Sequence, residues 1–205
     1  MSSPLIIGID PGRSAAVAVV RAPAQGRPVL LGAWNVFGAK HKSSAERAWG
    51  RSLDKCLAEL GTLAPMVARI WVEDPPADGK TKKRAKGNPW GKGGRMGSTR
   101  GPDFLLRLGR FQGELIRGLR TLYGMDPLLL PQNEWAKELR VPNGKQTAPF
   151  GSTPRGWHRC AEAALHVEGY KLPPTAKDDN AGERTVAIAE AVLIAACGAQ
   201  RWRGQ

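Results

Sequence analysis

The amino-acid sequence predicts an α/β fold in which helices flank a five-stranded mixed sheet, with three antiparallel strands plus parallel strands. Three apolar segments, residues 5–9, 15–21 and 29–36, follow one another across short turns, which is typical of an antiparallel meander. Two more apolar segments, residues 66–72 and 127–130, each come after a stretch with helical periodicity. This order favours strands that join the sheet through a helix, as parallel strands do.

Helical periodicity and capping residues define the expected helices. Ser43 or Ser44 caps the first of them, which ends at Gly61. Further helices are expected over residues 104–123, 134–139, 157–166 and 181–197. Gly109 and Gly113 lie four residues apart in the helix that begins at residue 104. We therefore expect a backbone to approach closely there, either a sheet face or a second subunit.

Length, charge and cysteine content restrict the class of protein. At 205 residues, the chain suits a single domain over residues 1–205 with a sizeable core. It carries 31 Lys and Arg against 18 Asp and Glu, a formal net charge of +13, which indicates nucleic acid as a partner rather than a membrane surface. No apolar run approaches the roughly 20 residues of a membrane-spanning helix, and no signal peptide is expected. Three widely spaced cysteines suit a reducing compartment, so we expect a cytoplasmic protein.

Residues 79–101 have a composition of their own, with eight basic residues and no acidic one. Such a segment cannot bury a core, which predicts a long, flexible basic loop. We expect it to contact phosphates, with an aromatic side chain free to stack on an exposed base. The candidate nucleic-acid-binding residues are Lys80, Lys82, Lys83, Arg84, Lys86, Trp90, Lys92, Arg95 and Arg100. The alternative is a solvated insertion without a role.

Carboxylates stand where two buried strands are expected to end. Asp10 closes the first apolar segment, just before a Pro-Gly turn, and Glu73 follows the segment 66–72. If these strands lie side by side and parallel, Asp10 and Glu73 meet, and the closing helix adds Glu190 or Glu183. Carboxylates that close cannot all ionise without a cation, and oxygen-only ligands suit Mg²⁺ or Mn²⁺. The alternative for Asp10 is a turn or capping aspartate.

Two such ions, about 4 Å apart, can activate water and stabilise the leaving oxygen in phosphodiester cleavage. Together with the basic composition, this hypothesis makes DNA or RNA the natural substrate.

Four segments resemble RuvC-type Holliday junction resolvases of the RNase H-like superfamily, most closely phage and other divergent members. Residues 8–12 are similar to the opening motif, 72–73 to the second motif, 105–113 to a helix with a Leu-Gly, Gln and Gly pattern, and 189–195 to the closing acidic helix. The resemblance implies a metal-dependent endonuclease that cuts four-way DNA junctions as a homodimer, in a bacterial or phage-infected cell. It also implies that Asp10 and Glu73 are metal ligands.

The remaining ligands on the closing helix stay open. The family has two acids about one turn apart on this helix, whereas Ala187 stands three residues before Glu190. Glu190 and Glu183 are the leading candidates, and Asp179 comes behind them. Because the acid set is incomplete at Ala187, the second hypothesis is a non-catalytic nucleic-acid-binding protein on an RNase H-like scaffold. An actin-like or sugar-kinase ATPase is disfavoured, because the chain is too short for two such lobes.

Overall fold

The computed structural model describes residues 3–11, 15–36, 45–63, 66–74, 102–141, 157–172 and 179–204. Of residues 45–52, 102–108, 111, 157 and 179–184 it describes the backbone alone. The strands are β1 (Leu5–Asp10), β2 (Ala16–Arg21), β3 (Val29–Asn35), β4 (Val67–Asp74) and β5 (Leu128–Pro131). The helices are α1 (Ala45–Gly61), α2 (Pro102–Tyr123), α3 (Gln132–Glu138), α4 (Trp157–His166) and α5 (Asp179–Arg203).

The five strands form one mixed sheet in the order β3-β2-β1-β4-β5. β1 pairs with β2, and β2 with β3, in antiparallel fashion, whereas β4 lies parallel to both β1 and β5. The predicted fold class is therefore confirmed, and so is the parallel pairing of the first and fourth strands. In the register of this pair Ile9 lies opposite Val72, so Asp10 and Glu73 are the next residues along two adjacent strands.

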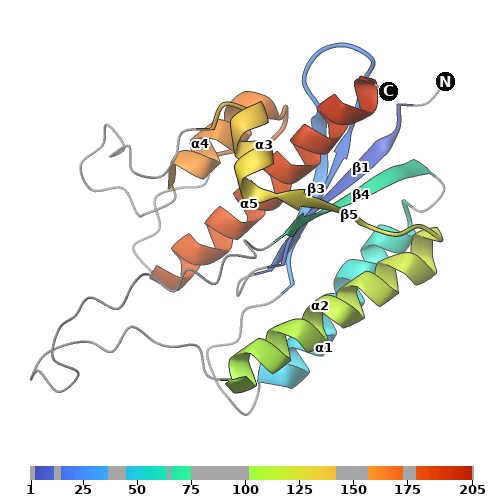
Figure 1. Cartoon of the computed structure of the whole chain (residues 1–205), viewed down its shortest axis with the longest axis vertical. Coiled ribbons are helices and arrows are strands. Elements are labelled where there is room, and N and C mark those ends of the chain that lie inside the picture. The colour runs from blue at the N-terminus through green and yellow to red at the C-terminus, as the bar shows by residue number, and fades with distance from the viewer. Residues whose placement is uncertain are drawn as a thin grey trace, which may run out of the picture.

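Helices cover both faces of the sheet (Figure 1). α1 and α2 lie on one face, and α5 lies on the other with α3 and α4 beside it. Two apolar cores follow from this layering. Ile7 and Ile9 of β1 face the core beneath α1 and α2, while Ile6 faces the core beneath α5. Because β1 is buried on both faces, its sequence is a continuous apolar run rather than an alternating one.

α5 crosses the sheet at unusually short range because two glycines remove side chains from the contact. A Cβ on Gly8 of β1 would overlap the carbonyl oxygen of Ala191 and the backbone nitrogen of Ala195. At the other end of the crossing, a Cβ on Gly198 would overlap the indole ring of Trp71. The backbone of α5 therefore rests directly on β1, two residues before Asp10.

Replacing Gly8 with alanine is expected to destabilise the fold by about 3 kcal/mol, because the methyl group meets helix backbone that cannot rotate away. The matched control is Gly109→Ala in α2. No atom of the described residues lies within 4 Å of a Cβ there, so helix propensity should stabilise that variant by up to about 1 kcal/mol. Urea unfolding of both variants tests this. A Gly8→Ala protein as stable as the parent would show that α5 is not seated on β1.

The expectation that Gly109 and Gly113 face the sheet is wrong. Neither position has any atom within 4 Å of an added Cβ, so no element of the described chain packs there. The close approach on α2 falls instead on Gly118, where an added Cβ would crowd the side chain of Leu57 on α1. Contact of Gly109 and Gly113 with a second subunit stays a prediction.

Other predicted boundaries differ by a few residues. The closing helix runs from residue 179 to residue 203, longer at both ends than the predicted 181–197. The helix expected over residues 157–166 is present as α4. The predicted basic loop, residues 79–101, lies outside the described residues. No helix in the described part of the chain is long and apolar enough to cross a membrane.

Candidate functional site

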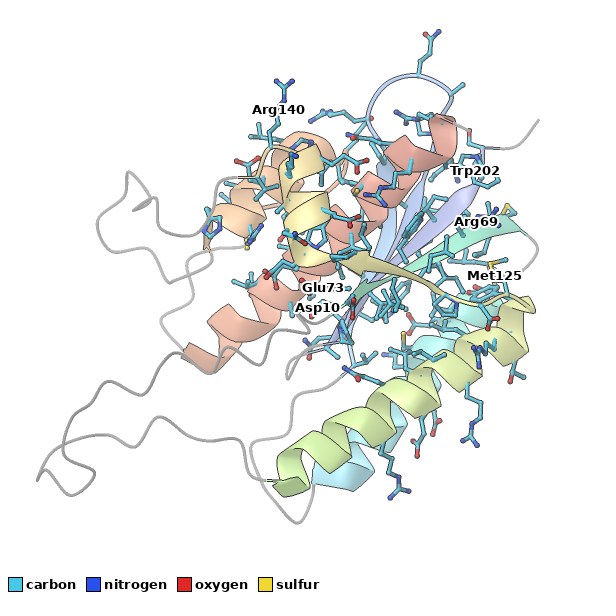
Figure 2. The ribbon with its side chains drawn as sticks, in the orientation of Figure 1. Asp10, Arg69, Glu73, Met125, Arg140 and Trp202 are labelled. Atoms are coloured by element: carbon cyan, nitrogen blue, oxygen red, sulfur yellow. The ribbon has the colours of Figure 1, made fainter. Side chains whose placement is uncertain are left out.

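Asp10 and Glu73 lie side by side at the carboxyl ends of two parallel, adjacent strands (Figure 2). Both side chains are buried, with only 7% of Asp10 and 8% of Glu73 exposed. Acidic residues are almost never this buried unless a partner compensates the charge. The sequence places them here because each apolar strand ends in a carboxylate, and parallel pairing then brings the two ends together.

Helix α2 fixes the backbone that follows Asp10. The side-chain amide of Gln112 donates a hydrogen bond from Nε2 to the carbonyl oxygen of Pro11, at 3.2 Å. Gln112 belongs to the segment 105–113, and this contact gives that segment a structural role next to the acid pair.

Glu190 is the third carboxylate of the site, and α5 supplies it. Its neighbour Ala191 is the residue whose carbonyl oxygen rests on Gly8, so the close crossing of α5 and β1 brings Glu190 towards the acid pair. Burial raises the pKa of Glu190, while Arg159 lowers it. Glu190 is close enough to Glu73 for its charge to raise the pKa of Glu73.

The acid cluster, Asp10, Glu73 and Glu190, makes Glu73 hard to ionise. Burial raises the pKa of Glu73 to about 8, with the charges of Asp10 and then Glu190 adding to the effect. The Trp135 indole N–H and Arg159 act in the opposite direction. The indole interaction is weak, because Nε1 of Trp135 makes no hydrogen bond of normal geometry to any described residue. A carboxyl group perturbed in this way at a cluster of acids is typical of a functional site.

Two residues of the site were not predicted from the sequence, Trp135 of α3 and Arg159 of α4. The Arg159 side chain lies over the indole ring of Trp135, with Cζ 4.8 Å from the ring centroid. Its Nε lies 3.5 Å from Oε1 of Glu190. Arg159 is only 8% exposed and Trp135 is fully buried. The site therefore combines three carboxylates with one buried guanidinium.

A sequence signal for Arg159 was present. Ala163 and Val167 are buried on α4 and the turn that follows it, and Arg159 precedes them at the same spacing of four residues. An arginine on the buried stripe of an amphipathic helix needs an acidic or aromatic partner. Trp135 carried a weaker signal, as a tryptophan in a short helix just after the edge strand β5.

The donor chemistry of the acid cluster suits a hard divalent cation, since all donors are carboxylate oxygens. Within the described ranges, however, no three His, Cys, Asp or Glu side chains lie close enough together to hold a metal ion. Glu190 is instead engaged by Arg159. By donor chemistry the adjacent carboxyl groups of Asp10 and Glu73 suit a divalent cation, whereas Glu190 is paired with Arg159 in this structure.

Other predicted site residues are not brought to this cluster by any described contact. Asp179 and Glu183 lie in the first turns of α5, and their side chains are outside the described residues. The same holds for the candidate DNA-contacting residues 80–100. Ala187 is 4% exposed and packs in the apolar core, so the helix position one turn before Glu190 carries no ligand.

Five mixed strands in this order, flanked by helices on both faces, match an RNase H-like fold. Two solved structures are similar over nearly the whole chain. A Thermus thermophilus RuvC structure matches with a TM-score of 0.59 and 15% identity, covering 98% of this chain and 96% of that one. T. thermophilus RuvC in complex with Holliday junction substrate matches with a TM-score of 0.60, 13% identity and the same coverage. At this identity the likeness shows the fold, which is the RuvC fold.

No sequence profile of a known family matches the chain, and no curated protein matches it significantly. The predicted relation to phage members therefore has no support from these comparisons.

Proposed function

We propose that this protein is a divalent-cation-dependent, structure-selective DNA endonuclease that cuts phosphodiester bonds in four-way junctions. The observation that carries the proposal is the buried pair Asp10 and Glu73, held side by side at the ends of β1 and β4. Two buried acidic residues on adjacent strand ends are costly for the fold, because burial and then the charge of Asp10 raise the pKa of Glu73 to about 8. Such an arrangement is expected where a cation is bound for function.

Asp10 and Glu73 would hold the cation, Mg²⁺ or Mn²⁺, and Glu190 would complete its ligands. When bound, the cation supplies an activated water for attack on the phosphodiester and charge to stabilise the leaving oxygen. Gln112 would hold the backbone of Pro11, next to Asp10, through its hydrogen bond to the Pro11 carbonyl oxygen. The proposal includes a second ion, with Glu183 or Asp179 as its ligands.

The charge of the chain supports DNA as the substrate. A formal net charge of +13 favours a polyanion, and the basic residues from Lys80 to Arg100 are proposed to contact its phosphates. The RuvC structure with a bound Holliday junction has the same fold, which supports branched DNA as the particular ligand. A homodimer acting in the cytoplasm as one nuclease domain is part of the proposal.

A non-catalytic DNA-binding protein is the second candidate, and two observations favour it. Ala187 leaves one position of the closing helix without a ligand, and Arg159 occupies Glu190. In this case the acid cluster has no catalytic role, and the basic residues of the chain carry the function by binding DNA.

Incubation of the full-length protein with a mobile four-way junction, a fork and a linear duplex, with and without Mg²⁺, tests the proposal. We expect Mg²⁺-dependent nicks in the junction and none in the duplex. Binding without nicking across a range of Mg²⁺ and Mn²⁺ concentrations would favour the second candidate. Cleavage of all three substrates alike would contradict structure selectivity.

Replacing Gln112 with leucine is expected to lower the junction cleavage rate about tenfold, because the backbone of Pro11, next to Asp10, loses its hydrogen bond from α2. The loss in unfolding free energy should be only about 1 kcal/mol, the net value of one hydrogen bond. Gln200→Leu, at an exposed position of α5, is the matched control and should cleave normally. A Gln112→Leu rate equal to that of the parent would show that the contact does not position Asp10.

A further inference from the structure

Arg159 is buried beside the acid cluster and is only partly satisfied there. Its Nε lies 3.5 Å from Oε1 of Glu190, while Nη1 is buried and has no hydrogen-bond partner in the described structure. A buried guanidinium offers five N–H donors, so an unpartnered Nη1 leaves capacity for another acceptor.

The ion pair between Arg159 and Glu190 is weak enough for Glu190 to exchange to another partner. Nε of Arg159 lies 3.5 Å from Oε1 of Glu190, longer than the 2.7–2.9 Å typical of a strong charge-assisted hydrogen bond, and Nη1 takes no part in the pair. Stacking on Trp135 fixes the guanidinium independently, with Cζ 4.8 Å from the ring centroid. Glu190 can therefore leave Arg159 while Arg159 stays in place.

The charge of Arg159 acts on more than its direct partner. It lowers the pKa of both Glu190 and Glu73, so the positive charge is felt across the cluster. The positive charge of Arg159 would repel a divalent cation at Asp10 and Glu73. The cation would also compete with Arg159 for the Glu190 carboxylate.

We infer that Arg159 is a positioning residue that competes with a divalent cation for Glu190, holding this carboxylate in the cation-free protein and releasing it when the cation binds. The inference rests on the proposed cation site. It means that the affinity of the site is set by an internal guanidinium, and that cation binding and the release of Glu190 are coupled.

Titration of the full-length protein with Mn²⁺, followed by electron paramagnetic resonance without DNA, tests the competition. We expect Arg159→Met to bind Mn²⁺ about tenfold more tightly than the parent, because a nearby positive charge is removed. Arg159→Lys keeps the charge and should remain close to the parent. Unchanged or weaker binding by Arg159→Met overturns the inference, and so does equal tightening in Arg159→Lys.

Arg201 offers a matched control. It also lies over a tryptophan, with Cζ 5.4 Å from the Trp71 ring, and it pairs with Glu134 and Glu138 at 3.2 and 2.9 Å. Arg201→Met should leave the Mn²⁺ affinity unchanged, because its partners are not in the acid cluster. Tighter Mn²⁺ binding by this variant would mean that net charge alone explains the result, which overturns the inference.

A second measurement needs no cation. In chelator, we expect Arg159→Met to lower the melting temperature by about 8 °C, and by less than half as much in a Glu190→Gln background. Equal losses in both backgrounds would show that Arg159 does not hold Glu190. If Arg159→Met cannot be purified, Glu190→Gln alone is informative, since it should weaken Mn²⁺ binding about tenfold and unchanged binding overturns the inference.

These outcomes are separable from the nuclease proposal. A protein that binds Mn²⁺ under control of Arg159 but cuts no junction refutes the nuclease and retains the competition. A protein that cuts junctions, but whose Mn²⁺ affinity does not change when Arg159 is replaced, supports the nuclease and refutes the competition.

Discussion

Replacing Asp10 with asparagine should reduce Mg²⁺-dependent cleavage of a four-way junction by about a thousandfold or more, while junction binding is retained. The substitution keeps the shape of the side chain but removes one of the two buried charges that would hold the cation. Loss of a ligand that supports cation chemistry costs several kcal/mol of transition-state stabilisation, which gives this factor. Binding should hold or tighten slightly, since the site loses negative charge towards a polyanion.

Single-turnover cleavage of a labelled junction measures the rate, and an electrophoretic mobility shift in Ca²⁺ or chelator measures binding. Asp54→Asn, at an exposed position of α1, is the matched control and should cleave and bind as the parent does. Full cleavage by Asp10→Asn would reject the acid pair as the catalytic centre. Loss of binding together with cleavage would point to a structural role for Asp10.

The central sheet could be predicted because its information is local and repeated. Each strand from β1 to β4 is a short apolar run bounded by turn residues, and the carboxylates at 10 and 73 mark the ends of two of them. Only the relative placement of β1 and β4 required a tertiary assumption. Once they are parallel neighbours, the period of the strands brings Asp10 and Glu73 together without further information.

Helix contacts were harder to predict, because helical spacing does not say which surface a helix meets. Gly109 and Gly113 have the spacing of a close contact, yet an added Cβ at either would lie within 4 Å of no atom in the described residues. The tight crossing depends on Gly8 in a strand and Gly198 in α5, each of which is opposite a partner far away in sequence. Such a match is set by three-dimensional packing rather than by either local pattern.

The candidate site likewise has residues that local sequence predicts and residues that only tertiary packing brings together. Its acids could be proposed from strand ends and one helix, but Arg159 reaches Glu190 only through the packing of α4 against α5. A sequence search for acidic residues finds the carboxylates of the site but misses the positively charged Arg159 that lies beside them. The rule that a buried charge needs a partner applies in both directions, and applied to the buried stripe of α4 it would have singled out Arg159.

Replacing Glu73 with glutamine should abolish cleavage and, in chelator at high pH, stabilise the fold. In the folded protein the pKa of Glu73 is raised from an ordinary value of 4.5 to about 8, by burial first and then by Asp10 and Glu190. Between these two values the folded state holds a proton that the unfolded state has released. Stability must therefore fall as pH rises from about 4.5 to about 8, and level off above that.

Glutamine carries no titrating proton, so the variant should escape this loss. Above pH 8 it should exceed the parent by on the order of 5 kcal/mol, whereas near pH 4.5 the two should be nearly equal. Urea unfolding in chelator at pH 5 and pH 8.5 measures the difference, and Glu168→Gln, at an exposed position, should show none. A Glu73→Gln protein no more stable than the parent at pH 8.5 would mean that the acid cluster costs the fold nothing.

Adding Mg²⁺ tests whether the stability lost at Glu73 is connected with cation binding. A cation that binds the acid pair stabilises only the protein that can bind it, so the parent at pH 8.5 should gain stability with Mg²⁺ concentration while Glu73→Gln should not. The advantage of the variant would then shrink as the site fills. Glu73 would then lower the stability of the cation-free protein, and only cation binding would restore it. Packing alone would favour replacement of such a residue, so its presence indicates a role in binding or catalysis.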